Sequence, residues 1–157
     1  MKTTEFELDV SYSQIGVFKA EMAEPFNNWT DEHVAQGFAW RPGSVSFKTL
    51  VEAGPHKIEL VVSDTPQPVS TGVIRAILVP FSVPRKGKIE IASISDGQTL
   101  KVPTGTYSLR YEAFMLGKHP HVRFSLLPKC PVDFIIEVAD PELSPPKKLL
   151  LTAEPAN

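Results

Sequence analysis

Cysteine, histidine and long hydrophobic runs are all scarce in this sequence of 157 residues. The single cysteine, Cys130, excludes a disulfide within the chain, and a lone cysteine is more often a small core or loop residue than a catalytic thiolate. No run approaches the roughly 18 apolar residues of a membrane-spanning helix, and the first residues lack an apolar signal segment. We therefore expect a cytoplasmic protein without membrane insertion, held at a membrane only through a partner.

Enzyme and metal signatures are also missing or incomplete. The sequence contains no nucleophile elbow, zinc-protease, P-loop or dinucleotide-binding glycine motif, so we expect no catalytic residues and no cofactor. His119 and His121 form an H-x-H pair, which in a strand places both imidazoles on one face, as metal-binding β-barrels require. Pro120 between them favours a loop, and His33 and His56 show no ligand spacing with the pair. A metal- or ligand-binding β-sandwich remains an alternative interpretation.

The net charge is low, but the charges are unevenly distributed. The formal net charge of −2 argues against a strongly basic nucleic-acid-binding protein, so we expect no direct binding of nucleic acid. Residues 1–36 hold seven acidic and two basic residues, a net charge of −5, whereas the remainder holds 11 acidic and 14 basic residues, a net charge of +3. The split indicates either an acidic surface for a basic partner or two halves that neutralise each other after folding.

Alternating hydrophobic and polar residues cover most of the chain. In residues 107–113 the alternation is strict, which is the period of a strand buried on one face. Residues 5–12 and 122–126 follow the same pattern, and turns rich in proline and glycine separate such stretches. With almost no helix, the sequence predicts a mainly β fold, a two-layer antiparallel β-sandwich of about eight to ten strands with one short helix.

The length of the chain favours one domain. A chain of this size buries about 68–70% of its unfolded surface around a single core. We expect residues 1–152 to form one β-sandwich domain that ends in an edge strand at 147–152. The short polar remainder, residues 153–157, is expected to be a frayed tail.

The short helix is predicted near residues 31–36. Thr30 is a favourable N-cap residue, and Gly37 provides a left-handed stop. The two acidic residues of the first turn lie near the positive end of the helix dipole. A helix of about two turns does not persist without packing. We expect it to be pinned to a sheet through Trp29, Val34, Phe38 and Trp40, with its polar side chains in water: Asp31, Glu32, His33 and Gln36.

The acidic turn bordered by two tryptophans is the candidate partner-binding site. Two more carboxylates lie in the preceding loop. Each kind of residue also has a structural explanation, because the acids match the helix dipole or form a solvated face, and large aromatic residues commonly fill small cores. The candidate set is Glu21, Glu24, Trp29, Asp31, Glu32 and Trp40.

Four segments of the sequence resemble the competence protein J family, the inhibitors of DNA-entry nucleases. Over about residues 5–116, their order and spacing match that family, and the W-T-D-E-x-x-x-x-G pattern is the most specific of them. After Gly117 the chain departs from the family pattern. The segments are SYSQIGVF at 11–18, NWTDEHVAQGFAWRPGSVSF at 28–47, VPFSV at 79–83 and VPTGTYSLRYEAF at 102–114.

The resemblance implies a non-catalytic protein that binds a partner nuclease and blocks its nucleic-acid cleft. A related alternative is an immunity protein that protects a cell from a toxin nuclease. A nuclease must present lysine and arginine to phosphates, so carboxylates with an aromatic anchor can compete for that surface. The family supplies no catalytic residues to carry over.

Overall fold

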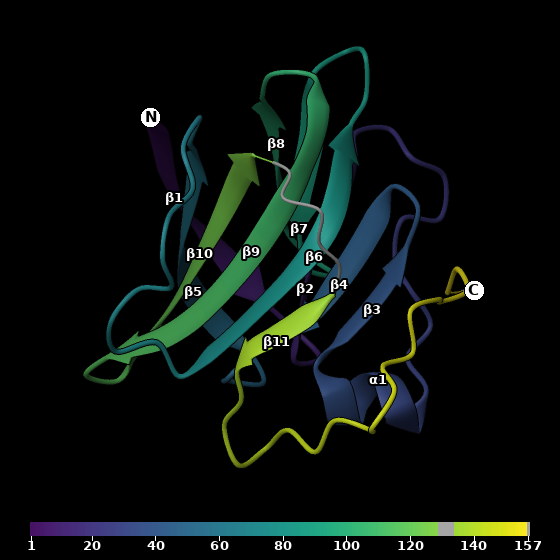
Figure 1. Cartoon of the computed structure of the whole chain (residues 1–157), viewed down its shortest axis with the longest axis vertical. Coiled ribbons are helices and arrows are strands. Elements are labelled where there is room, and N and C mark those ends of the chain that lie inside the picture. Colours follow the sequence, from purple (N-terminus) through teal and green to yellow (C-terminus); the bar gives the residue numbers. More distant parts are fainter. Residues whose placement is uncertain (129–133, 157) are drawn as a thin grey trace.

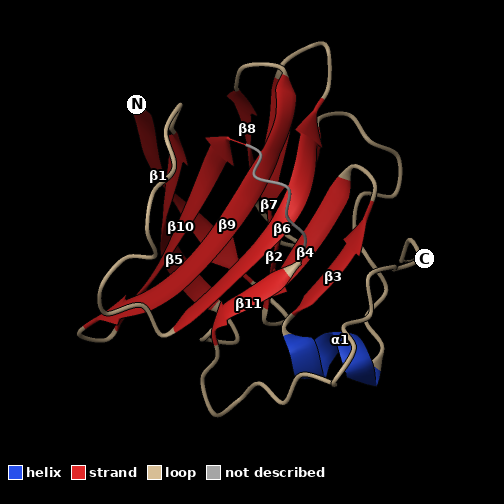
Figure 2. Cartoon of the chain, in the orientation of Figure 1, coloured by secondary structure: helices blue, strands red, loops and turns tan. Residues whose placement is uncertain are grey.

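The computed structural model describes residues 1–128 and 134–156, which form two β-sheets and one short helix (Figure 1; Figure 2). The sheets pack face to face, and the helix lies at the end of one edge. The elements are β1 (Lys2–Val10), β2 (Gln14–Lys19), α1 (Asp31–Gln36), β3 (Phe38–Arg41), β4 (Ser44–Lys48), β5 (Gly54–Val62), β6 (Arg75–Val83), β7 (Lys88–Ala92), β8 (Gly97–Lys101), β9 (Gly105–Leu116), β10 (His119–Pro128) and β11 (Ile135–Val138).

The mainly β, two-layer fold with a helix at 31–36 is confirmed. One sheet has the strand order β1-β5-β10-β9-β6-β11 and the other β3-β4-β2-β7-β8. Two details differ from the prediction, since β5 and β10 run parallel, and the described residues contain 11 strands rather than about eight to ten. The unpredicted strand, β3, has four residues, which are too few to show an alternating period.

The core lies between the sheets and is filled by the inward side chains of both. Phe47 of β4 stacks on Tyr111 of β9 with ring centroids 4.6 Å apart, and Phe124 of β10 packs against both rings. The Tyr111 hydroxyl also donates a hydrogen bond to the Lys48 carbonyl (2.9 Å), and burial raises the pKa of this tyrosine. These contacts fix β4, so that the Lys48 side chain stands at a defined place on the outer face.

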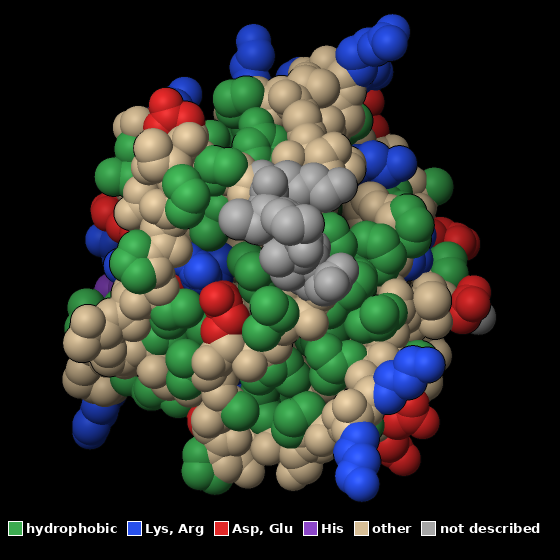
Figure 3. Space-filling view, viewed as in Figure 1, with side chains coloured by type: hydrophobic (Ala, Val, Ile, Leu, Met, Phe, Trp, Pro, Cys, Tyr) green, Lys and Arg blue, Asp and Glu red, His purple; other side chains and the backbone are tan. Residues whose placement is uncertain are grey.

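The outer face of the six-stranded sheet is not simply solvated. Figure 3 shows this side of the molecule, with scattered hydrophobic side chains and with lysine and arginine projecting at its margin. On β9, Arg110 and Glu112 are buried because the 63–74 loop and β11 cover them. Arg110 pairs with Glu137 of β11 (2.8 Å), and the Ser70 amide donates to Glu112 (2.7 Å). Alternation in residues 107–113 predicted a strand buried on one face only, and this was wrong for Arg110 and Glu112, which are buried on its other face.

The segment that leads to the C-terminus begins at a buried ion pair. Arg75 of β6 is fully buried, and its Nε and Nη2 donate to the two oxygens of Asp140 at 2.7 and 2.8 Å. Its Nη1 donates to the Lys48 carbonyl at 2.8 Å. Glu142 lies 3.9 Å from the guanidinium and is mostly exposed. The pair therefore ties the segment after β11 to the middle of the sandwich.

Residues 144–152 then run along α1 (Figure 1). Gln36 donates to the Leu150 carbonyl (2.8 Å) and accepts from the Leu150 amide (2.9 Å). His33 Nε2 lies 2.8 Å from the Thr152 carbonyl. The predicted edge strand at 147–152 was wrong. These residues form no strand, and backbone groups of Leu150 and Thr152 instead contact the Gln36 and His33 side chains of the helix.

The last described residues continue this contact. The Asn28 amide donates to the Glu154 carbonyl (2.8 Å), and the Ala156 amide donates to the Phe26 carbonyl (2.9 Å). Residues expected to fray thus make backbone hydrogen bonds with the loop before α1. The helix therefore leads directly into β3 at Phe38 and is contacted along its side by the C-terminal segment.

Candidate protein-binding surface

Helix α1 is defined by its caps. The Thr30 side chain accepts from the His33 amide, and the His33 ring in turn lies 3.0 Å from the Thr30 amide, which completes a capping box. Gly37 has φ +87°, the left-handed conformation that ends the helix, and its amide donates to the His33 carbonyl. The bounds of the helix follow directly from these residues, as the sequence predicted.

The helix faces are arranged differently from the prediction. His33 and Gln36, expected in water, are buried, because the C-terminal segment covers them and provides carbonyl and amide partners. Val34, expected to pin the helix to a sheet, is 42% exposed. The helix therefore buries polar side chains against a later part of the chain and shows an apolar one to solvent.

The two acidic residues of the first turn lie at the molecular surface. Asp31 and Glu32 are both exposed, and neither forms an ion pair with any residue in the described ranges. Glu21 and Glu24 are also exposed, but Glu21 lies near Lys86 (3.7 Å) at the β7 end of the sheet. Asp31 and Glu32 therefore lie at the helix, whereas Glu21 lies at the start of the loop that precedes the helix, close to Lys86.

The loop that carries these residues is anchored by Asn27, which the sequence analysis did not single out. Its buried amide donates to the Ala39 carbonyl (2.9 Å), and its Oδ1 accepts from Arg41 Nε (2.6 Å). Arg41 also donates to the Glu24 carbonyl. Nothing in the local sequence distinguishes Asn27 from its exposed neighbour Asn28, so only the fold reveals its role.

The two tryptophans lie on opposite faces of the five-stranded sheet. Trp40 of β3 points inward, donates from Nε1 to the Pro80 carbonyl (2.8 Å) and packs edge-on against Phe134 at 5.0 Å. Trp29 lies over the outer face, half-buried, with its ring edge-on to His33 at 6.4 Å. Trp29 is therefore near the acidic turn, whereas Trp40 packs against the core.

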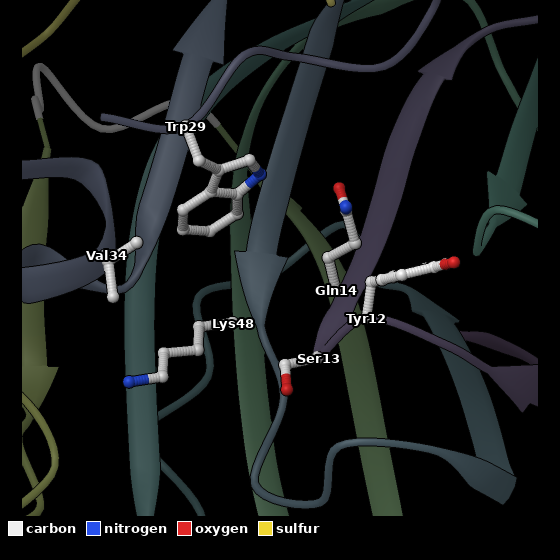
Figure 4. A pocket seen from close by; sticks show the side chains of 6 residues that line it. All are labelled: Tyr12, Ser13, Gln14, Trp29, Val34 and Lys48. Carbon is white, nitrogen blue, oxygen red and sulfur yellow. The ribbon is translucent and has the colours of Figure 1, made fainter. Parts of the chain in front are cut away.

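A surface cavity of about 310 Å³ lies beside Trp29 (Figure 4). Its floor contains Gln14 of β2 and Lys48 of β4, which are directly opposite each other in the sheet. We call it the Tyr12–Trp29 pocket, and it is lined by Tyr12, Ser13, Gln14, Trp29, Val34 and Lys48. Sequence reasoning did not connect Tyr12, Ser13 or Gln14 with the helix.

The turn at the rim of this pocket has an unusual backbone. Tyr12 and Ser13 both have φ +56°, a left-handed conformation that costs about 1–2 kcal/mol for each residue with a side chain. Hydrogen bonds hold the turn, because the Ser13 amide donates to the Glu52 carbonyl (2.8 Å) and the Thr49 amide donates to the Ser13 carbonyl (2.9 Å). The Tyr12 side chain is 76% exposed.

The described residues contain no assembled metal site. His119 and His121 lie in β10, so Pro120 does not produce the expected loop. His121 stacks on Phe114 at 5.3 Å, and no group of three or more histidine, cysteine or acidic side chains within 1–128 and 134–156 is arranged to hold a metal ion. Cys130 lies outside the described residues. No helix that the structure describes is long and apolar enough to cross a membrane.

Together, the fold and this surface define a small β-sandwich with an exposed aromatic and acidic patch at one short helix. The chain belongs to the competence protein J (ComJ) family, whose model matches residues 7–134. A relative described as a DNA-entry nuclease inhibitor, from Bacillus subtilis strain 168, is 32% identical over 104 residues, which are 66% of this chain and 76% of the relative. The resemblance read from the sequence is thereby confirmed.

Two solved structures share the fold. One is ComJ from Bacillus subtilis, described as an inhibitor of the DNA degrading activity of NucA, with a TM-score of 0.72 and 23% identity. The other is described as crocagin biosynthetic gene J, with a TM-score of 0.57 and 16% identity. Each match covers 82% of this chain and 98% of the other. Residues after 134, including β11 and the segment along α1, lie beyond the family match.

Proposed function

We propose that this protein is a non-catalytic inhibitor that binds a NucA-type DNA-cleaving nuclease and blocks its access to DNA. The observation that carries the proposal is the pair Asp31 and Glu32, which are exposed, without an ion pair in the described structure, and inside the segment that the family model matches. A relative described as a DNA-entry nuclease inhibitor supports the choice of partner.

The physical basis is competition for a cationic surface. A DNA-binding groove gathers lysine and arginine to neutralise phosphates, and carboxylates on an inhibitor can take the place of those phosphates. Charges at the rim of an interface mainly raise the association rate and make it sensitive to salt. Asp31 and Glu32 are placed to do this, and Trp29 beside them offers the aromatic contact that often carries affinity.

The remaining expectations belong to the same proposal. We infer that the protein acts in the cytoplasm, that it reaches a membrane only with its nuclease, and that it cleaves nothing itself. We also infer that residues 1–152 fold as one unit, because β1 and β11 belong to the same sheet. Glu24 is proposed as an outer contact, whereas Trp40 is better assigned to the core.

The test is a DNA degradation assay with the NucA-type nuclease of the organism that makes this chain. The protein should suppress cleavage when it is added in excess, and should leave DNA intact when it is incubated without the nuclease. Replacement of Asp31→Lys together with Glu32→Lys should raise the half-inhibitory concentration by about 10-fold at low ionic strength, and by less at high salt.

The matched control is Glu7→Lys with Asp64→Lys. Both residues are exposed and lie away from α1, and the double variant changes the net charge by the same amount. It should inhibit like the parent protein. Absence of inhibition by the parent protein would remove the proposal, and an equal loss in both double variants would show that net charge, rather than this surface, is responsible.

A further inference from the structure

The Tyr12–Trp29 pocket contains two polar atoms whose hydrogen bonds are missing. Trp29 Nε1 and Gln14 Oε1 are shielded from solvent, and neither has a hydrogen-bond partner among the residues that the structure describes. Buried polar groups in folded proteins are nearly always paired, so two unpaired atoms in one pocket require an explanation. Figure 4 shows the nitrogen edge of Trp29 turned to the side on which Gln14 lies.

These atoms have complementary chemistry. An indole N–H can only donate, whereas the carbonyl oxygen of a glutamine side chain accepts. A peptide group offers one carbonyl and one N–H, and therefore satisfies both. The side chains that surround them can turn aside to admit such a group, because Gln14 is only half-buried and Tyr12 is largely exposed.

The walls of the pocket are apolar and partly exposed. Tyr12 and Val34 expose 76% and 42% of their surface, and the Trp29 ring lies between them. Tyr12 and Ser13 are the two central residues of a left-handed turn closed by the antiparallel bridge between Ser11 and Gln14, as in tight hairpins, and this turn holds the tyrosine at the rim of the pocket. A cavity of about 310 Å³ is large enough for one large apolar side chain.

We propose that the Tyr12–Trp29 pocket is the anchor of the nuclease interface. It binds one apolar residue of an extended nuclease segment, and the peptide group of that segment accepts from Trp29 Nε1 and donates to Gln14 Oε1. Asp31 and Glu32 next to the pocket select a segment in which the apolar residue is flanked by lysine or arginine. The inference rests on the proposed function and adds the pocket that provides most of the affinity for the nuclease.

The first test is a substitution at the rim. Val34→Lys replaces a β-branched residue with a better helix former at an exposed position, and places a long charged side chain at the pocket. It should raise the half-inhibitory concentration by about 30-fold or more, and high salt should not restore inhibition, because the lost contact is apolar. Leu116→Lys is the matched control, since Leu116 is 58% exposed at the far end of β9, and it should inhibit like the parent protein.

The second test separates binding from stability. Tyr12→Asn removes the ring but suits the left-handed conformation, because asparagine tolerates positive φ better than tyrosine does. The melting temperature should stay the same or rise, while inhibition weakens by about 10-fold. A merely structural role for Tyr12 would make stability and inhibition fall together, and would overturn the proposal.

The third test observes the indole groups by ¹⁵N NMR. The chain has two tryptophans and therefore two indole N–H signals. On addition of the catalytically inactive nuclease, the Trp29 signal should shift downfield as its N–H gains an acceptor. The Trp40 signal should stay in place, because its N–H already donates to Pro80. The two tryptophans thus provide a probe and a control within one molecule.

The outcomes distinguish the two proposals. If the parent protein inhibits but Val34→Lys inhibits equally well, or the Trp29 signal does not move, the pocket is not the anchor although the inhibitor function stands. If the protein self-associates and Val34→Lys is monomeric, a second copy occupies the pocket and the proposal is overturned. If the parent protein does not inhibit at all, the proposed function itself fails.

Discussion

Asp140→Asn should lower the free energy of unfolding by about 3–5 kcal/mol, because it leaves a fully buried guanidinium without its counter-charge. Arg75 makes two charge-assisted hydrogen bonds to Asp140, at 2.7 and 2.8 Å, and its other two acceptors are the uncharged carbonyls of Lys48 (2.8 Å) and Thr49 (3.4 Å). Glu142, at 3.9 Å and mostly exposed, cannot replace the lost carboxylate.

The assay is urea denaturation followed by circular dichroism. With a dependence on urea of about 2 kcal/mol per molar, the loss corresponds to a midpoint lower by about 1.5–2.5 M. Glu142→Gln is the control, and should change stability by less than about 1 kcal/mol, since exposed ion pairs contribute little. Equal midpoints for Asp140→Asn and the parent protein would refute the claim that this pair ties the C-terminal segment to the sandwich.

The same pair predicts a dependence on pH. Burial alone would raise the pKa of Asp140, but the hydrogen bonds and charge of Arg75 outweigh it and lower the pKa below the ordinary value of 3.8. A lowered pKa in the folded state means that the contribution to stability is complete above the ordinary value and is lost as the pH falls through the folded value. The stability difference between the parent protein and Asp140→Asn should therefore shrink in acid.

Two further predictions concern the backbone and a buried histidine. In thermal melts, Gly37→Ala should destabilise the protein by more than the control Gly72→Ala, for which we expect a loss of roughly 1 kcal/mol. Both glycines have positive φ, but a Cβ at Gly37 would lie 3.0 Å from Leu143, whereas a Cβ at Gly72 would meet no atom within 4 Å. Equal losses would show that the contact with Leu143 relaxes without cost. Burial lowers the pKa of His56, partly offset by a hydrogen bond to Gly54 and by Asp9, so stability should fall as the pH drops below the ordinary histidine value of 6.5. His56→Gln should flatten that slope between pH 7.5 and 5.5 while the exposed His119→Gln should not, and an unchanged slope in His56→Gln would contradict the assignment.

Much of the local structure could be predicted from the sequence. Thr30 and Gly37 set the ends of α1, because capping depends on a few adjacent residues. Strict alternation located β9, since the period of a strand is visible without knowledge of its neighbours. The family resemblance, carried by four short segments, pointed to the partner class from residue identities alone.

The candidate site was predicted only in part. Asp31, Glu32 and Trp29 were identified as neighbours in the chain, and the structure brings them to one surface. Trp40 was grouped with them because it is close in sequence. In β3, however, Trp40 lies two positions after Phe38, so both side chains point to the same inward face of the sheet. Tyr12 and Gln14 were missed, because only the pairing of β2 with β4 brings them to the pocket.

By itself, the sequence determined both ends of the helix, the location of strands such as β9, and which carboxylates and aromatic residues stand near the helix. The tertiary structure decided which faces are covered. The C-terminal segment buried His33 and Gln36 and left Val34 exposed, and the β2–β4 register formed the pocket beside Trp29. The physical reason is that periodicity and capping act over a few residues, whereas burial depends on segments more than 100 positions apart, such as Gln36 and Leu150.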